Sequence, residues 1–175
     1  MIKQAEDNYK NYAFLSLLRT CDMLNRYLGL QLRKHNITPS CFGLMNAILS
    51  HEKGKTPSYI SGWLFRSKHA VTSLIHALEA KGAIKQKLDS QDRRSKCIIL
   101  TKAGRKAVAK VMPTVKTTVE NVFFSLDREE IETLNGILKQ LRKALYKGIN
   151  SHIGNKAARP PVKVSRTPQV PPKRR

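Results

Sequence analysis

Polar side chains recur at helical spacing in the segment between Ser67 and Gly82. They are Lys68, His69, Thr72, Ser73 and His76, and each can form hydrogen bonds. Apolar residues fill positions 71, 74, 75 and 78, which predicts an amphipathic helix with one polar face. Side chains of these types can read base edges in the major groove of DNA, although a solvated helix face would show the same periodicity.

A second group of charged residues lies on a predicted hairpin that follows this helix. Apolar and β-branched residues predict strands at 84–88 and 97–100, and the polar residues between them predict a turn. The charged residues there are Asp92, Arg93, Arg94 and Lys96. An arginine on a thin hairpin can enter the minor groove of DNA, where the negative potential is strongest.

Start and stop signals predict the elements that must position these two groups. Ser67 is a suitable N-cap for the polar helix, Gly82 suits its end, and Thr101 can cap the next helix. Thr-Pro pairs at 38–39 and 56–57 predict the starts of two earlier helices. The short second helix, 57–64, and the polar helix together predict a helix-turn-helix.

Three motifs carry a resemblance to a known family. They are Leu78-Glu79-x-x-Gly82, Asp92-Arg93-Arg94 and Leu100-Thr101-x-x-Gly104. In this order and spacing they resemble the winged-helix core of the MarR family of bacterial and archaeal transcriptional regulators. Segments 37–39, 56–64 and 126–130 are similar to the starts of other helices in that family. The resemblance extends over roughly residues 10 to 147.

The resemblance implies a mainly α fold. It comprises a winged helix-turn-helix core, long N- and C-terminal dimerisation helices and a β wing of two or three strands. The domain would span residues 1–147, with the DNA-binding core at about 37–101 and the dimerisation helices at 9–34 and 102–147. Residues 148–175 are basic and rich in proline, which predicts a disordered tail.

Apolar stripes outside the core predict a second copy of the chain as a partner. Heptad-like spacing is typical of a coiled-coil-like surface that a single winged core cannot cover. The candidate interface residues are Leu17, Leu24, Val119, Leu134, Leu138, Leu141 and Leu145. A two-fold dimer would present two identical recognition helices to an inverted repeat of double-stranded DNA.

The family pattern also assigns roles to the polar and charged residues of the helix, the turn and the hairpin. Ser67, Lys68, His69, Thr72, Ser73 and His76 would lie along the major groove. Arg94 would enter the minor groove, with Asp92 restricting its rotamers by a charge-assisted hydrogen bond. Arg93, Lys96 and Arg66 would meet phosphates. Arg66 departs from the family pattern, because that position in the turn is usually apolar.

Composition supports a polyanionic partner. The 175 residues carry a formal net charge of +21, which favours nucleic acid, with an anionic membrane surface as the competitor. No apolar run is long enough to span a bilayer, and the first ten residues lack the apolar core of a signal peptide. A cytoplasmic protein with no membrane partner is the expectation.

The residues give no support for an enzyme, a cofactor or a metal site. Cys21, Cys41 and Cys97 form no C-x-x-C pair, so they are predicted to be reduced and buried. The sequence Gly54-Lys55-Thr56 resembles the end of a phosphate-binding loop, but Leu49 occupies the place of the required glycine.

Three functional hypotheses follow. The first is a regulator, most often a repressor in this family, which the resemblance implies can respond to a small aromatic ligand bound between the dimer helices and the core. The second is a nucleoid-type structural protein that coats DNA with little sequence preference. The third is a metal- or redox-gated switch on the same fold.

Overall fold

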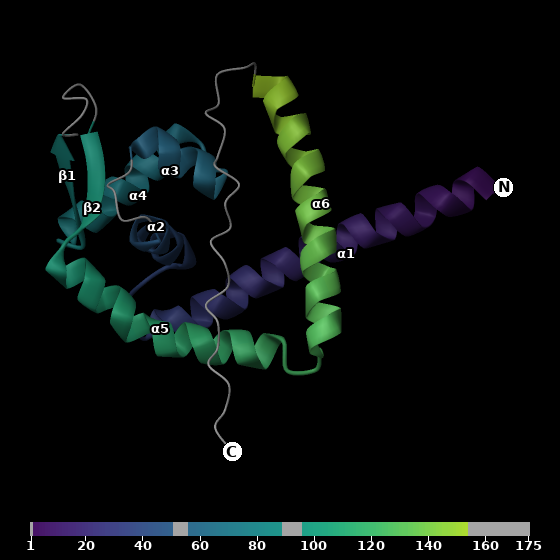
Figure 1. The fold of residues 1–175 in the computed structure, drawn as a ribbon, viewed down its shortest axis with the longest axis horizontal. Helices are drawn as coiled ribbons and strands as arrows, with labels where there is room; N and C mark the ends of the chain where they lie inside the picture. The colour runs from purple at the N-terminus through teal and green to yellow at the C-terminus, as the bar shows by residue number, and fades with distance from the viewer. Residues whose placement is uncertain (1, 51–55, 89–95, 154–175) are drawn as a thin grey trace.

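The protein is mainly helical, with one two-stranded hairpin in the described part of the chain. Its structure is a computed structural model that describes residues 2–50, 56–88 and 96–153. The elements are α1 (Ile2–Arg33), α2 (Pro39–Leu49), α3 (Pro57–Leu64), α4 (Lys68–Ala80), β1 (Ile84–Leu88), β2 (Lys96–Leu100), α5 (Lys102–Val122) and α6 (Arg128–Ile153). Elements α2 to β2 form the winged core, from which α1, α5 and α6 extend (Figure 1). The predicted fold class is confirmed.

Side-chain caps explain where the four helices from α2 to α5 begin. The hydroxyl oxygens of Thr38, Thr56, Ser67 and Thr101 each accept a hydrogen bond of 3.0–3.2 Å from the backbone N–H three residues later. Proline fills the first position of α2 and α3, where the helix needs no N–H. Each of these starts is where the sequence predicts it.

Helix α1 runs out of the winged core as a long arm and packs near its end against α5 (Figure 1). Leu32 is fully buried there, and Nε2 of His35 lies 2.8 Å from Oγ1 of Thr114 on α5. Helix α5 bends along its length and contains Pro113, a residue that removes a helical hydrogen bond and favours a kink. None of the described helices is apolar enough over a sufficient length to cross a bilayer.

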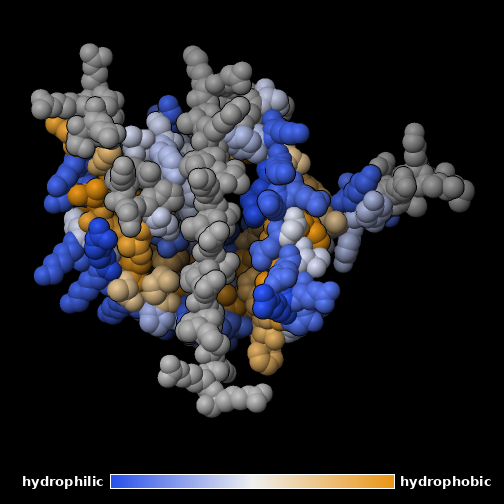
Figure 2. All heavy atoms as spheres, viewed as in Figure 1, coloured by the Kyte–Doolittle hydropathy of each residue, from blue (hydrophilic) through white to orange (hydrophobic). Residues whose placement is uncertain are grey.

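Helix α6 begins with a capping box in segment 126–130, where the family resemblance predicts a helix start, and then runs back towards the winged core. Asp127 Oδ1 accepts from the N–H of Glu130, and Glu130 Oε2 accepts from the N–H of Asp127, both at 2.9 Å. Near the other end, the ring of Tyr146 meets that of Phe65 edge-on, with centroids 6.4 Å apart. Apolar side chains remain at the surface beside α6 and α1 (Figure 2).

Several boundaries differ from the sequence prediction. Helix α1 begins at Ile2, well before residue 9. Helix α6 continues to Ile153, past the predicted start of the tail at Gly148, and residues 154–175 lie outside the described residues. The prediction of three buried cysteines is wrong for Cys21, which is exposed because α1 projects away from the core.

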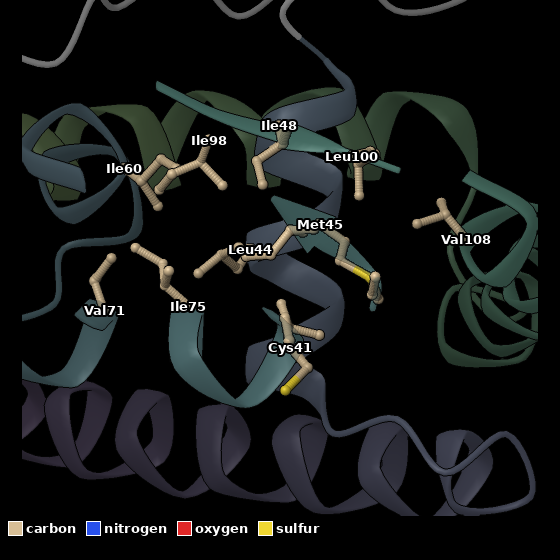
Figure 3. Packing of buried hydrophobic residues seen from close by; sticks show 13 residues of the cluster. Cys41, Leu44, Met45, Ile48, Ile60, Val71, Ile75, Ile98, Leu100 and Val108 are labelled. Atoms are coloured by element: carbon tan, nitrogen blue, oxygen red, sulfur yellow. The ribbon is translucent and has the colours of Figure 1, made fainter. Parts of the chain in front are cut away.

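The core lies between α2 and the elements that surround it. Leu44 and Met45 of α2 meet Ile60 of α3, Val71 of α4 and Ile98 of β2, and all five are essentially inaccessible to solvent (Figure 3). Burial of each such side chain contributes about 1.5–3 kcal/mol. Because one core joins α4 to both strands, the polar helix and the hairpin are held in a defined relation.

A tight joint connects α5 to the turn between α4 and β1. Thr101 Oγ1 donates to the carbonyl of Gly82 at 2.6 Å, and Gly82 has a left-handed φ of 65°. A Cβ on Gly104 would lie 1.9 Å from the carbonyl oxygen of Ala83. The spacing Thr101-x-x-Gly104 therefore has a physical basis, since the threonine closes the joint and the glycine leaves room for it.

The wing is an antiparallel pair whose register runs from Ile84↔Leu100 to Leu88↔Lys96. Two strands are present among the described residues, within the predicted two or three. Lys96 belongs to β2, one residue earlier than the predicted strand. The turn residues 89–95 lie outside the described residues.

Candidate nucleic-acid interface

The polar face of α4 is at the surface, as its pattern predicts. All five of its polar side chains are exposed: Lys68, His69, Thr72, Ser73 and His76. The opposite face, with Val71, Ile75 and Leu78, is buried in the core. Helix α4 therefore presents a row of hydrogen-bonding side chains while its apolar side holds it in place.

The exposed polar side chains of α4 differ in whether they can donate a hydrogen bond to a base or accept one from it. Ser73 Oγ donates to the carbonyl of His69 at 3.1 Å, one turn earlier in α4. While that bond persists, Ser73 can only accept a hydrogen bond from a base. Lys68 can only donate, so the two residues would select different base edges.

Hydrogen bonds within the turn between α3 and α4 set the angle between the two helices. Ser61 Oγ donates to the carbonyl of Arg66 at 2.6 Å, and the N–H of Arg66 donates to the carbonyl of Ser61 at 3.1 Å. Phe65 ends α3 in the left-handed region, at φ 50°. Ser67, itself exposed, then caps α4. The Arg66 side chain is exposed and available to a phosphate. Burial raises the pKa of the Tyr59 phenol in α3 above its ordinary value.

The hairpin adds lysines that sequence reasoning missed. Lys96 is exposed at the start of β2, while Asp92, Arg93 and Arg94 lie outside the described residues. Lys85 and Lys87 on β1 are also exposed, because they alternate with Ile84 and Gln86 on the strand. That two-residue alternation was the signal available in the sequence. Hydrophilic side chains project from the side of the molecule that carries the hairpin (Figure 2).

Charges on α4 and the hairpin are not neutralised by ion pairs among the described residues. The ion pairs found there join Lys116 to Glu120 on α5 and Arg128 to Glu132 on α6. Among the described residues, no acidic side chain forms an ion pair with the lysines on the hairpin or at the start of α4. With a net charge of +21, this is the electrostatic pattern of a nucleic-acid-binding surface.

A cavity of about 350 Å³ lies between α2, the end of α4, the start of α5 and the loop that joins α1 to α2. Its lining is mostly apolar and includes Met45, Leu78 and Ala107. Two polar groups also line it. Lys81 Nζ donates to the carbonyl of Asn36 at 3.3 Å, and His35 Nδ1 is buried without a hydrogen-bond partner in the described part of the chain. Sequence reasoning named neither His35 nor Lys81 as a site residue.

The predicted interface residues, six leucines and Val119, differ in their exposure within one chain. Leu17, Leu134 and Leu138 are half-buried, whereas Leu24, Val119, Leu141 and Leu145 are exposed. Leu145 is 59% exposed and Leu141 39%. These side chains lie on the three helices that leave the winged core, so the folded single chain keeps a large apolar surface.

Metal-binding groups do not gather in the described residues. No cluster of three or more histidine, cysteine or acidic side chains suited to a metal ion occurs in residues 2–50, 56–88 and 96–153. His69 and His76 are both exposed on α4, seven residues apart.

Comparison with known proteins gives the same family as the motifs. A sequence model of the MarR family matches residues 35–95. A proposed transcriptional regulatory protein for the hcr operon of Thauera aromatica is 26% identical over 105 residues. That match includes 60% of this chain and 63% of the relative, so the chain spans just under two thirds of the relative's length.

Solved structures share the fold. The S. aureus MepR–DNA complex is 25% identical, has a TM-score of 0.68, and matches 76% of this chain and 97% of MepR. CouR from Rhodococcus jostii RHA1, bound to p-coumaroyl-CoA, is 19% identical with a TM-score of 0.63, and matches 77% of this chain and 88% of CouR. Together with the exposed α4 face and the basic wing, these matches identify the chain as a member of the MarR family of DNA-binding winged helix-turn-helix transcriptional regulators.

Proposed function

We propose that this regulator is a homodimeric repressor that binds an inverted repeat and leaves it when a small aromatic ligand fills the cavity. The observation that carries the DNA-binding part is the exposed polar face of α4 beside a hairpin whose lysines have no ion-pair partner among the described residues. The MepR relative, which was solved with DNA, supports the same use of the fold.

In this proposal α4 enters the major groove. Lys68 donates to guanine acceptors, and His69, Thr72, Ser73 and His76 contact further base edges along the helix. The opposite face of α4 is well packed, which supports this role, because a recognition helix must be held rigidly to discriminate between bases.

The hairpin and the turn would contact the backbone and the minor groove. Arg94 enters the minor groove with Asp92 as its partner, as the family motif implies. Arg93, Lys96 and Arg66 meet phosphates, and to these the structure adds Lys85 and Lys87 as exposed candidates. Each phosphate contact would release about one counterion and so contribute to salt dependence.

Variants of the two contact groups should separate base reading from charge. Lys68→Ala or His69→Ala should cost about 1–3 kcal/mol on the operator and little on random DNA, because base contacts carry sequence information. Arg94→Ala should weaken binding to both and reduce the log–log salt slope by about one. Fluorescence anisotropy at several salt concentrations measures both quantities.

Lys139→Ala is the matched control for charge, since Lys139 is exposed on α6. It should leave operator binding within about twofold of the wild type. Equal affinity of the wild type for operator and random DNA at every salt concentration would instead support the nucleoid-type protein. Loss of binding on oxidation or metal removal would support the gated switch.

The cavity supports the ligand part of the proposal. It lies between the winged core, the start of α5 and the loop that follows α1, so a bound molecule would contact both the core and α5. A volume of about 350 Å³ suits a small aromatic compound, and Lys81 places a cation among the residues that line it. The CouR relative was solved with an aromatic acyl-CoA, which shows that its fold can hold an aromatic group.

Two simple probes test the ligand site. Benzoate should lower operator affinity, and Lys81→Met should weaken the effect of benzoate by about tenfold while sparing that of neutral 2,4-dichlorophenol, because only the carboxylate needs the cation. Ala107→Phe should abolish the response to both by filling the cavity. A response to benzoate that both variants retain in full would place its site elsewhere.

A further inference from the structure

The last turn of α4 is bonded to the first strand of the wing through one carboxylate. Glu79 Oε1 accepts from the backbone N–H of Gln86 at 3.2 Å, and Glu79 Oε2 accepts from Nε2 of Gln86 at 2.9 Å. Both side chains are half-buried. These two hydrogen bonds join a side chain of α4 to the hairpin.

The helix itself disfavours an acid at this position. Glu79 is the only acidic residue of α4, and it stands in the last turn, where the helix dipole is negative. A carboxylate there gains nothing from its own helix. The two hydrogen bonds to Gln86 give it a local role that offsets this cost.

Glu79 supplies a hydrogen-bond acceptor at the edge of β1 that does not face β2. In the described sheet β1 pairs only with β2, and Gln86 stands opposite Ile98. The N–H of Gln86 bonds to Glu79 and not to β2, so it belongs to the open edge of the strand. Glu79 therefore holds β1 by its open edge at mid-strand.

Two of the exposed lysines lie directly beside this attachment. Lys85 and Lys87 flank Gln86 on β1, and Lys87 stands opposite Cys97, next to Lys96. The core fixes the base of the hairpin through Ile84, Ile98 and Leu100, but not the outer half of β1, where Leu88 is exposed. Any rotation of that outer half would move the lysines relative to α4.

We infer that Glu79 is a positioning residue for DNA binding, because its carboxylate sets where the wing lysines meet the duplex relative to the recognition helix. The inference rests on the proposed contact between wing and DNA. It opposes the simple electrostatic expectation, in which removing a negative charge near the interface tightens binding to a polyanion.

Three variants separate position from charge. Glu79→Ala should weaken operator binding by about tenfold and lower the log–log salt slope by roughly one, because the lysines lose their alignment with phosphates. Glu79→Gln should stay within about threefold of the wild type, since its amide can still bond both groups once Gln86 rotates its own amide. Gln86→Ala, which keeps only the backbone bond, should fall between the two.

The controls decide between this inference and its alternatives. Glu132→Ala removes the same charge from exposed α6 and should change neither affinity nor slope. Unfolding monitored by circular dichroism tests whether Glu79→Ala folds; if it does not, Gln86→Ala still has to lower affinity and slope. Tighter or unchanged binding by Glu79→Ala, or a Glu79→Gln variant as weak as Glu79→Ala, would overturn the inference.

Failure of the inference is distinguishable from failure of the proposed wing contact. Lys85→Ala and Lys96→Ala test that contact without touching Glu79. If these lysine variants bind normally, the wing lysines do not contact DNA and the inference loses its basis, whatever Arg94 does. If they bind weakly while Glu79→Ala and Gln86→Ala bind normally, the wing contacts DNA without needing the Glu79 attachment, and only the inference is wrong.

Discussion

Replacing Gly104 with alanine should destabilise the protein by about 3 kcal/mol or more, near the upper end of the overpacking range. The new Cβ would lie 1.9 Å from the carbonyl oxygen of Ala83 and 2.9 Å from its carbonyl carbon. Backbone atoms cannot rotate aside as a side chain can, so either α5 or the turn between α4 and β1 must move. Thermal unfolding followed by circular dichroism should show a fall of the order of 10 °C.

Two other glycines provide matched controls. Gly136 and Gly148 lie within α6, and a Cβ at either would meet nothing within 4 Å. Alanine there should stabilise the protein by about 0.4–1 kcal/mol, because it reduces the entropy of the unfolded chain. Should Gly104→Ala behave like Gly136→Ala, the joint between α5 and the turn would be looser than the structure shows.

The same variant bears on DNA binding. Thr101 and Gly104 join α5 to the turn that follows α4, so a shift there changes the angle between α5 and α4. The cavity lies beside this joint, with Ala83 and Ala103 among its lining residues. A ligand in the cavity would act on the same junction, which is why the proposed release mechanism needs no distant pathway.

Local chemistry made much of the fold predictable. A cap such as Thr38 or Ser67 acts within one turn of its own helix, so its effect can be inferred from adjacent residues. The inward face of α4 was predictable for the same reason, since Val71 and Ile75 follow the helical period. The capping box at Asp127 also needed no tertiary information.

Contacts between distant segments were not predictable in this way. The motif Leu78-Glu79-x-x-Gly82 contains Glu79, but its hydrogen bonds to Gln86 depend on the direction in which β1 leaves the turn. The cavity forms only because His35, in the loop after α1, and Lys81, after α4, come together with α2 and α5. The exposure of Cys21 depends on the direction in which α1 leaves the core, which periodicity does not give.

Introducing Asp at Leu141 and Leu145 together should abolish the proposed dimer. Both side chains are apolar yet 39% and 59% exposed in one chain, so the fold of the subunit has little need of them. In a two-fold interface the double variant would bury four carboxylates, each at a cost of several kcal/mol. We expect the dissociation constant of the dimer to rise by at least about a thousandfold, measured by sedimentation velocity.

A charge-matched control lies on the opposite face of α6. Gln140→Asp with Lys147→Asn changes the net charge by the same amount at exposed positions and should leave the dimer intact. Operator affinity should collapse in the Leu141→Asp, Leu145→Asp variant, because a monomer engages one half-site and loses the benefit of the second. Unfolding of that variant is also consistent with an obligate dimer. A wild-type protein that is a stable, folded monomer at micromolar concentration would refute the dimer and, with it, the inverted repeat.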